Sequence, residues 1–228
     1  MTLSTIAIIP AHDEAERLPE TLAALSNIPG LMRVIVADDG SRDATAEISH
    51  AHGAEVVEAA PSGQPSGKGN ALLVGLTVAR CFAPEAVLLA DADLGASASK
   101  LAGLIGALDE RNPVAIAAFP PAKYGGFGFV KALTRRAIAR RTGHDFSEPL
   151  SGQRALLLSA LETLPGIAPG FGAEAGMTLD LLAAGIEPRE VSIPLTHRPT
   201  GKTFVGFAHR ARQGRDIVQA LRGDRHPW

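Results

Sequence analysis

The stretch AVLLADADLGAS, residues 86–97, decides the fold because its apolar run ends in two aspartates one residue apart. An uninterrupted run such as residues 86–90 is typical of a strand that is covered on both faces of its sheet. Asp91 is then expected where the chain leaves the sheet. Side chains alternate in extended chain, so Asp91 and Asp93 point the same way, with about 7 Å between their Cα atoms. Two carboxylates this close predict a bound cation or water.

Strand-like and helix-like stretches alternate through the first half of the chain, at a spacing typical of βαβ units and a parallel sheet. The predicted strands are residues 4–10, 33–40, 54–59, 86–90, 113–119 and 187–195. The predicted helices are residues 14–25, 43–52, 67–80, 97–109, 129–141 and 172–185, with a basic helix in 204–225. The pattern predicts an α/β fold with helices on both faces of the sheet.

Composition limits the class of protein. The chain has 228 residues and is 46% apolar, so we expect a single domain, residues 1–228. No run approaches the roughly 20 apolar residues of a membrane span. The start, MTLSTIAIIPAHDEAE, has no basic segment or cleavage-like site, which favours a cytoplasmic location. The single cysteine, Cys81, excludes an intrachain disulfide and suits a reducing compartment.

Charge is distributed unevenly along the chain. Residues 1–120 carry 7 Lys and Arg against 15 Asp and Glu, a net charge of −8, whereas residues 121–228 carry 15 against 9, a net charge of +6. This asymmetry fits an anionic partner for the second half, or a solvated basic face. Aromatic residues make up 4% of the chain, and no stacking or groove-reading motif accompanies the basic residues, so nucleic acid is not an expected partner.

Polar residues follow three of the predicted strands, in residues 10–14, 38–41 and 91–93. Ligands of open α/β sheets bind beyond the carboxyl ends of the strands, so these residues are expected to line one crevice. Each group alone is better explained as helix caps or turn residues. The three groups together favour a binding site.

Four ordered motifs carry a resemblance to a known family. They are IIPAHDEAERLPETLAAL (8–25), VIVADDGSRDATAEI (34–48), GKGNALLVGL (67–76) and LLADADLG (88–95). In this order they resemble the family 2 glycosyltransferases, nucleotide-sugar-dependent enzymes of the GT-A fold. The resemblance implies a Rossmann-like, mostly parallel sheet with a smaller acceptor-binding C-terminal part. Residues 1–119 would bind the nucleotide sugar and residues 120–228 the acceptor.

The resemblance also implies roles for single residues. Asp91-Ala92-Asp93 matches the DxD motif, which holds Mg²⁺ or Mn²⁺, makes both aspartates catalytic and brings Asp91 to the donor. His12 and Asp13 depart from the Asn and Glu that are usual in the first motif, a difference that bears on the base preference rather than on the fold. The remaining implied donor contacts are Pro10, Ala11 and Glu14 for the nucleoside, Asp39 for the base and Lys68 for the diphosphate.

Electrostatics supports the same reading without the family. A diphosphate would be repelled by Asp91 and Asp93 unless a divalent cation bridged the carboxylates to phosphate oxygens. That metal would act as a Lewis acid, and both the metal and Lys68 would stabilise charge on the leaving group. The alternative interpretation of Lys68 is a solvated lysine with no ligand.

The second half contains SGQRALLLSAL (151–161), FGAEAGMTLDLLAAG (171–185) and EVSIPLTHRPTGKTF (190–204). These resemble later motifs of the polyprenyl-phosphate sugar transferases and of the glucosyl- or mannosyl-3-phosphoglycerate synthases. Both branches use an acceptor that bears a phosphate, so the implied partners are a nucleoside-diphosphate sugar and an anionic acceptor. Polyprenyl phosphate would favour contact with the inner face of the membrane.

Several residues of the second half are candidates by this resemblance. His197 matches a histidine that completes the metal shell in the phosphoglycerate branch, or it is a surface histidine. Gly95 stands where the polyprenyl branch has a metal-binding Gln. Glu174 resembles a catalytic, acceptor-side glutamate that takes a proton or only orients the acceptor, or it is a first-turn acid of a helix. Candidates for the acceptor phosphate are Arg135, Arg136, Arg140, Arg141 and Arg154. The first four could instead press a basic helix against anionic lipid or form a solvated helix face.

The resulting hypothesis is an inverting, metal-dependent glycosyltransferase that uses a donor of the UDP-glucose or GDP-mannose type and an acceptor such as polyprenyl phosphate or 3-phosphoglycerate. Inversion follows from the resemblance alone. Two alternatives stay open, a sugar-phosphate nucleotidyltransferase and a non-catalytic nucleotide-sugar-binding module.

Overall fold

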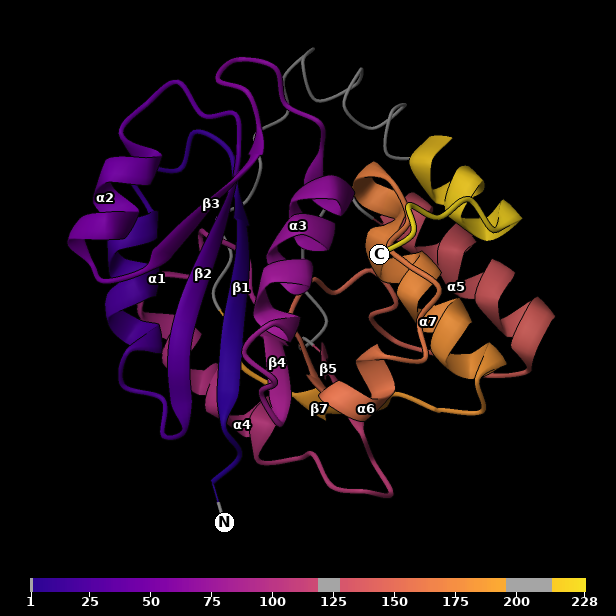
Figure 1. The fold of residues 1–228 in the computed structure, drawn as a ribbon. Helices are drawn as coiled ribbons and strands as arrows, with labels where there is room; N and C mark the ends of the chain where they lie inside the picture. The colour runs from indigo at the N-terminus through magenta and orange to yellow at the C-terminus, as the bar shows by residue number, and fades with distance from the viewer. Residues whose placement is uncertain (1, 119–127, 196–214) are drawn as a thin grey trace.

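The computed structural model describes residues 2–118, 128–195 and 215–228 and contains one seven-stranded sheet (Figure 1). The strand order is β3-β2-β1-β4-β6-β5-β7. Strands from both halves of the chain share this sheet. The strands are β1 (Thr5–Ala11), β2 (Leu31–Asp39), β3 (Glu55–Ala60), β4 (Ala86–Leu89), β5 (Val114–Ala118), β6 (Arg154–Leu157) and β7 (Arg189–Ser192).

The sheet is mostly parallel, with one reversed strand. β1 pairs in parallel with β2 and β4, β2 with β3, and β5 with β7. β6 lies between β4 and β5 and is antiparallel to both. The sequence pattern did not predict β6, because its four residues run directly into a helix and show no period of their own. The other six strands were predicted.

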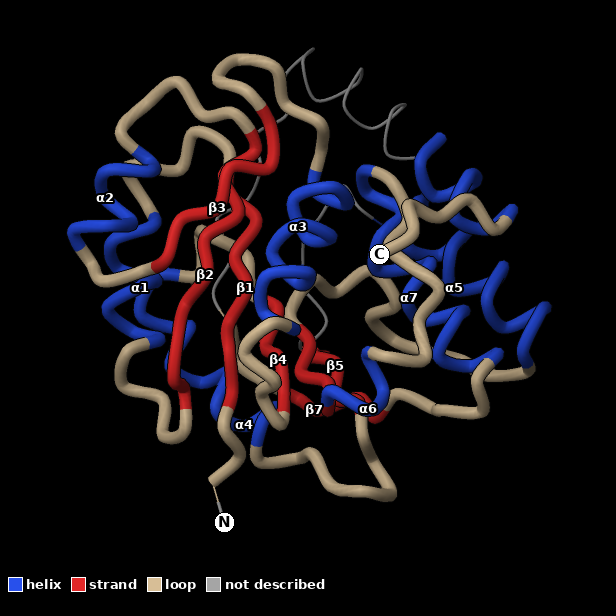
Figure 2. The backbone as a smooth tube through the Cα atoms, viewed as in Figure 1, coloured by secondary structure: helices blue, strands red, loops and turns tan. Residues whose placement is uncertain are grey.

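Helices cover both faces of the sheet, as predicted (Figure 2). Residues 215–222 are also helical, whereas the rest of the predicted basic helix up to residue 214 lies outside the described residues. The helices are α1 (Leu18–Leu25), α2 (Thr45–Ala51), α3 (Lys68–Arg80), α4 (Ala102–Ile105), α5 (Gly128–Thr142), α6 (Leu158–Leu161) and α7 (Ala173–Ala183), with 3₁₀ helices η1 (Gly95–Leu101) and η2 (Gly170–Gly172).

Two predicted helices differ from the observed ones. α1 begins at Leu18 rather than at residue 14, because Pro19 has no amide hydrogen and is tolerated only in the first turn. The helix predicted for residues 97–109 is a 3₁₀ helix, η1, that continues into the single turn of α4.

Alternation along the strands divides the core into two layers. In β1, Ile6 and Ile8 pack with α3, α6 and α7, whereas Ala7 and Ile9 pack with α1, η1 and α4. Successive side chains of a strand point to opposite faces, so an unbroken apolar run produces a core on each side. All four of these side chains are fully buried.

Among the described residues, no helix has the length and apolar character needed to cross a membrane.

Gly75 sets how closely α3 approaches the sheet. A Cβ atom at Gly75 would lie 2.6 Å from Ile8 Cγ2, a distance at which the buried core must shift. We predict that Gly75→Ala lowers the free energy of unfolding by about 1–2 kcal/mol, because overpacking outweighs the gain in helix propensity. Urea denaturation measures the change.

Gly103→Ala is the matched control. Gly103 is exposed on α4, and its Cβ atom would meet Ile193 Cδ1 at an ordinary 3.5 Å. This variant should leave the free energy of unfolding unchanged or raise it by up to about 1 kcal/mol. Equal effects of the two substitutions would show that the contact with Ile8 does not limit the approach of α3.

Candidate active site

The carboxyl edge of the sheet brings together the polar residues that follow β1, β2 and β4. Glu14 follows β1, and Asp91 and Asp93 follow β4. Burial raises the pKa of Glu14; Arg17 lowers it, and the charges of Asp93, Asp43 and Asp91 raise it further. The carboxylates after β1 and β4 therefore lie close enough to repel one another, which is the electrostatic setting that a bound cation would relieve.

Lys68 joins this edge to α7. It is the first residue of α3, and its Nζ lies 2.7 Å from Asp91 Oδ1 and 2.7 Å from Glu174 Oε1. Burial alone would lower the pKa of Lys68, but the charges of Asp91 and Glu174 outweigh it and raise the pKa. The Glu174 side chain is only 7% exposed. The Lys68 ammonium group thus contacts both Asp91, predicted to bind the sugar donor, and Glu174, predicted to bind the acceptor.

Gln153 is a site residue that the sequence analysis missed. Its Nε2 donates a hydrogen bond to Asp91 Oδ2 at 2.5 Å, and the residue is 1% exposed. The preceding Gly152 is also required, because a Cβ atom there would lie 2.7 Å from Lys68 Nζ and 2.9 Å from Asp91 Oδ1. Both residues precede β6, whose amino end lies at the carboxyl edge because β6 is antiparallel. Recognition of β6 as a reversed strand would have predicted them.

Asp39, the predicted contact for the base, also holds the loop before α3. It ends β2 and is 5% exposed. Its Oδ1 accepts hydrogen bonds from the Ser66 amide (2.8 Å) and hydroxyl (2.7 Å), and its Oδ2 accepts one from the Gly67 amide (2.7 Å). Both carboxylate oxygens therefore hold the loop before α3, and so help to place Lys68.

The turn after β1 is tied to the turn after β2. His12 Nδ1 lies 2.9 Å from the Asp39 carbonyl oxygen, and Asp13 Oδ1 accepts a hydrogen bond from the Arg42 amide at 2.7 Å. Asp13 has a φ of 54°, a left-handed conformation that Asp tolerates better than most residues. The two departures from the family motif thus both contact the second turn. Of the implied nucleoside contacts before them, Pro10 is half-buried and Ala11 is buried.

Arg154 lies elsewhere than predicted for an acceptor-binding arginine. Its side chain is fully buried, so it does not reach an acceptor phosphate. Its three guanidinium nitrogens donate to the Ser151 and Pro149 carbonyls and to Thr178 Oγ1, at 2.8–2.9 Å. Burial lowers the pKa of Arg154 to about 10.

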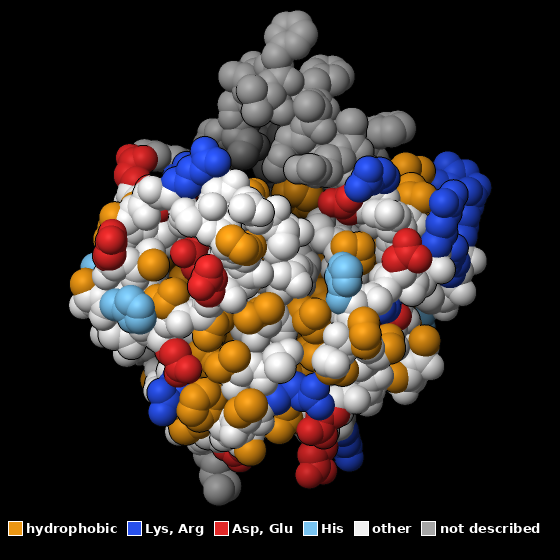
Figure 3. All heavy atoms as spheres, turned by 45° about the horizontal axis from the view of Figure 1, so that its top comes forward, with side chains coloured by type: hydrophobic (Ala, Val, Ile, Leu, Met, Phe, Trp, Pro, Cys, Tyr) orange, Lys and Arg blue, Asp and Glu red, His pale blue; other side chains and the backbone are white. Residues whose placement is uncertain are grey.

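The other candidate arginines lie on α5. Arg135 pairs with Asp145, and Arg141 donates to the Leu221 carbonyl. Arg136 and Arg140 are exposed and remain candidates for an anionic partner. Figure 3 shows Lys and Arg side chains gathered at the right edge of the molecule, on the side where Figure 1 places α5 and residues 215–222.

The chemistry of the donor set fits a metal that also binds phosphate. Among residues 2–118, 128–195 and 215–228, no three His, Cys, Asp or Glu side chains gather closely enough to hold an ion. His197 lies outside these residues. Mg²⁺ is commonly held by one or two carboxylates together with substrate phosphates. Asp91 and Asp93 could supply the carboxylates of such a site.

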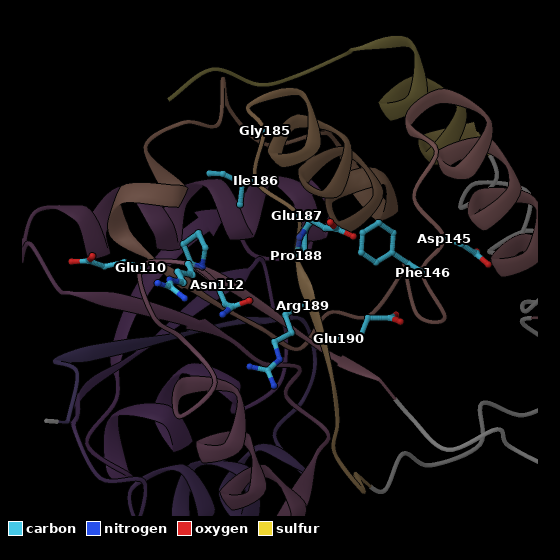
Figure 4. Close-up of a pocket in the computed structure, with 12 residues that line it drawn as sticks. Glu110, Asn112, Asp145, Phe146, Gly185, Ile186, Glu187, Pro188, Arg189 and Glu190 are labelled. Carbon is cyan, nitrogen blue, oxygen red and sulfur yellow. The ribbon is translucent and has the colours of Figure 1, made fainter.

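The cavities of the described residues do not all lie at this edge. A cavity of about 610 Å³ lies between residues 110–113 and 185–190, and none of the predicted site residues lines it (Figure 4). Acidic and basic side chains both contribute to its wall, among them Glu187 and Arg189. A cavity of about 300 Å³ lies at the ends of β2 and β3, with Asp38 and Ser62 in its wall.

Substitution of Lys68, whose ammonium group contacts both Asp91 and Glu174, tests how these residues are coupled. We predict that Lys68→Met lowers the free energy of unfolding by about 3 kcal/mol, because it leaves Glu174 buried without its partner. Adding Glu174→Gln should recover about 1–3 kcal/mol, since the uncompensated charge is then gone. Thermal and urea denaturation of the two single variants and the double variant measure this coupling.

Lys100→Met is the control, because Lys100 is exposed and its Nζ donates only to the Pro194 carbonyl among the described contacts. It should change stability by less than about 0.5 kcal/mol. Strictly additive effects of Lys68→Met and Glu174→Gln would contradict the ion pair.

Similar proteins were found both by sequence and by structure. The chain is 29% identical over 199 residues to the glycosyltransferase AglJ of Haloferax volcanii, covering 85% of this chain and 63% of that protein. It is 31% identical over 217 residues to an uncharacterised glycosyltransferase of Mycobacterium tuberculosis, a match that covers 89% of this chain and 90% of that protein. The chain thus spans less than two thirds of the first of these relatives.

A shorter match is to the dolichyl-phosphate beta-glucosyltransferase of Drosophila melanogaster, 38% identical over 105 residues, or 40% of this chain and 31% of that protein. Among solved structures, the chain resembles glucosyl-3-phosphoglycerate synthase of M. tuberculosis in complex with Mn²⁺, UDP and phosphoglyceric acid. The TM-score is 0.78 at 23% identity, over 97% of this chain and 78% of that one.

This structural likeness confirms the predicted GT-A fold, a mostly parallel Rossmann-like sheet with helices on both faces. The family model described as glycosyl transferase family 2 matches residues 6–165, which is more than half of the chain. The chain therefore belongs to glycosyl transferase family 2.

Proposed function

We propose that this chain transfers a hexose from a nucleoside-diphosphate sugar, of the UDP-glucose or GDP-mannose type, to an acceptor that bears a phosphate. The transfer depends on Mg²⁺ or Mn²⁺ and inverts the anomeric carbon, as family membership suggests. The observation that carries the proposal is the Lys68 ammonium, 2.7 Å from both Asp91 and Glu174. Residues 1–119 bind the donor and residues 120–228 bind the acceptor.

The donor side rests on charge. Asp91 and Asp93 would repel a diphosphate, so a divalent cation held by both carboxylates is the simplest way to bind one there. The bound metal would supply Lewis-acid stabilisation of the departing diphosphate. Lys68 adds a positive charge on the same side, where negative charge develops as the bond to the sugar breaks. Solved structures of the fold that contain Mn²⁺ or Mg²⁺ with UDP support this assignment.

The nucleoside is assigned to the turn after β1. Pro10 and Ala11 end this strand, and Glu14 follows it. Glu14 is held in place by its own amide, which donates to Thr45 Oγ1 at 2.9 Å. Its side chain is 22% exposed and so accessible to a ribose hydroxyl. Asp39 supports the neighbouring loop, and we retain it as the proposed contact for the base.

Glu174 is the acceptor-side carboxylate. It lies in the first turn of α7, is buried, and meets the donor side through Lys68. With a hydroxyl acceptor Glu174 takes the proton as a general base. A phosphate oxygen is already anionic and needs no base, and Glu174 then orients the acceptor.

A phosphate-bearing acceptor is supported by the net charge of +6 on residues 121–228 and by two relatives. One is described as a dolichyl-phosphate glucosyltransferase, and the other was crystallised with phosphoglyceric acid. Arg136 and Arg140 on α5 are exposed and could contact an anionic partner. A polyprenyl phosphate would bring this basic part of the chain to the inner surface of a membrane.

The test is a transfer assay with radiolabelled UDP-glucose and GDP-mannose in Mn²⁺. One arm supplies 3-phosphoglycerate, and the other supplies polyprenyl phosphate in vesicles. We predict labelled product and release of the nucleoside diphosphate in one arm. Asp93→Asn should lower kcat/KM by about 10²–10³-fold, because the metal loses one of its two carboxylates.

Asp109→Asn is the control, because Asp109 caps the turn at residues 111–112, before β5 and away from the carboxyl edge. Unchanged transfer by Asp93→Asn would refute the role of the aspartate pair. Pyrophosphate release from a nucleoside triphosphate and a sugar phosphate would instead identify a nucleotidyltransferase. Tight binding of a donor with no turnover in either arm would favour a non-catalytic binding module.

A further inference from the structure

The fully buried Arg154 has no place in the chemistry proposed above, although all three of its guanidinium nitrogens are engaged. Nε donates to the Ser151 carbonyl (2.8 Å), Nη2 to the Pro149 carbonyl (2.9 Å) and Nη1 to Thr178 Oγ1 (2.9 Å). Two of these contacts fix the loop before β6, and the third reaches α7. Arg154 is thus a direct link between two segments that are far apart in the sequence.

The loop that Arg154 holds also contacts the proposed donor side. Gln153 in this loop donates to Asp91 at 2.5 Å. Gly152 packs so closely against Lys68 and Asp91 that a Cβ atom there would lie within 3 Å of both side chains. A shift of the loop by an ångström would therefore move the surroundings of the Asp91 carboxylate.

The helix that Arg154 reaches carries Glu174. Thr178 lies one turn after Glu174, and its hydroxyl donates to the Glu174 carbonyl at 3.0 Å while it accepts from Arg154. The hydroxyl proton and its lone pair are thus both used, and the chain of contacts runs from Arg154 through Thr178 to Glu174. The charge of Glu174 also partly offsets the burial of the Arg154 cation.

We propose that Arg154 is a positioning residue for the proposed transfer reaction: by tying the 149–153 loop to α7, it sets the spacing between Asp91 on the donor side and Glu174 on the acceptor side. This inference rests on the proposed function of the site. A buried ion is seldom better for stability than an apolar side chain of similar volume. The planar fork of Arg, which lysine lacks, matches the three acceptors that come from two different segments.

The test compares Arg154→Lys, Arg154→Met and Thr178→Val with the wild type, at a temperature where all are folded. Thr77→Val is the matched control, because Thr77 Oγ1 makes the same type of bond, to the Leu73 carbonyl, on an exposed face of α3. Thr178→Val should preserve the fold even where an Arg154 variant does not.

In the transfer assay, the Arg154 variants should lose about 10²-fold in kcat and Thr178→Val about 10-fold, because misplacement of reacting groups by an ångström is that costly. The dissociation constant for UDP with Mn²⁺, measured by calorimetry, should change less than about threefold in Thr178→Val, since the donor carboxylates remain. Thr77→Val should match the wild type in both. If Arg154→Met keeps the wild-type kcat, packing alone explains the residue and the proposal is wrong.

Hydrogen exchange measured by mass spectrometry tests the proposal even where no transfer is detected. Thr178→Val should speed exchange both in peptides that cover residues 149–153 and in those that cover 172–180, because Arg154 couples the two segments. Faster exchange in 172–180 alone would show that the loop does not depend on this link. If the wild type shows no transfer but Thr178→Val still speeds exchange in both segments, the proposed function is refuted and the coupling by Arg154 stands.

Discussion

The Lys68 ammonium between Asp91 and Glu174 is the interaction on which the rest of the site depends. The positive charge of this group offsets the repulsion between two buried or half-buried carboxylates from distant parts of the chain, each 2.7 Å away. These contacts also require α3 to begin at Lys68, close to both carboxylates. Asp39 holds the loop before α3, so the end of β2 fixes the position of a lysine that serves β4 and α7.

Close backbone packing keeps these partners together. A Cβ atom at Gly69, in the first turn of α3, would lie 2.2 Å from the Ala168 carbonyl oxygen, in the chain that leads to η2 and α7. Asp216 accepts a hydrogen bond from the Phe171 amide in η2 at 3.2 Å, and Arg225 pairs with Asp180 on α7. The helix that carries Glu174 is therefore held from the donor side and from residues 215–228.

The sequence predicted much of the fold because its signals were local. Apolar runs marked six of the seven strands, and the acidic residues after β1 and β4 marked the carboxyl edge of the sheet. Those signals follow directly from the rule that parallel strands end at the same edge, beyond which ligands bind. The same rule placed Asp39 at the edge, but it did not show that the Ser66 and Gly67 amides occupy its carboxylate.

The residues that were missed depend on tertiary contacts. Gln153 reaches Asp91 only because β6 is antiparallel to its neighbours. A strand of four residues has no sequence pattern that shows its direction in the sheet. Arg154 looked like an exposed, phosphate-binding arginine because charged side chains are rarely buried. Its burial depends on backbone carbonyls of Pro149 and Ser151, which no side-chain pattern reveals. Hydrogen-bond partners of this kind become visible only in the folded chain.

We propose that the carboxyl edge binds a nucleoside diphosphate through a metal held by Asp91 and Asp93. The most direct test is the thermal unfolding midpoint with UDP or GDP, with and without Mn²⁺, for the wild type and Asp93→Ala. We expect one nucleotide with Mn²⁺, at about 100 times its dissociation constant, to stabilise the wild type by about 2.7 kcal/mol. Asp93→Ala should show no such gain. An unchanged midpoint with both nucleotides, or an equal rise in Asp93→Ala, would contradict the proposal.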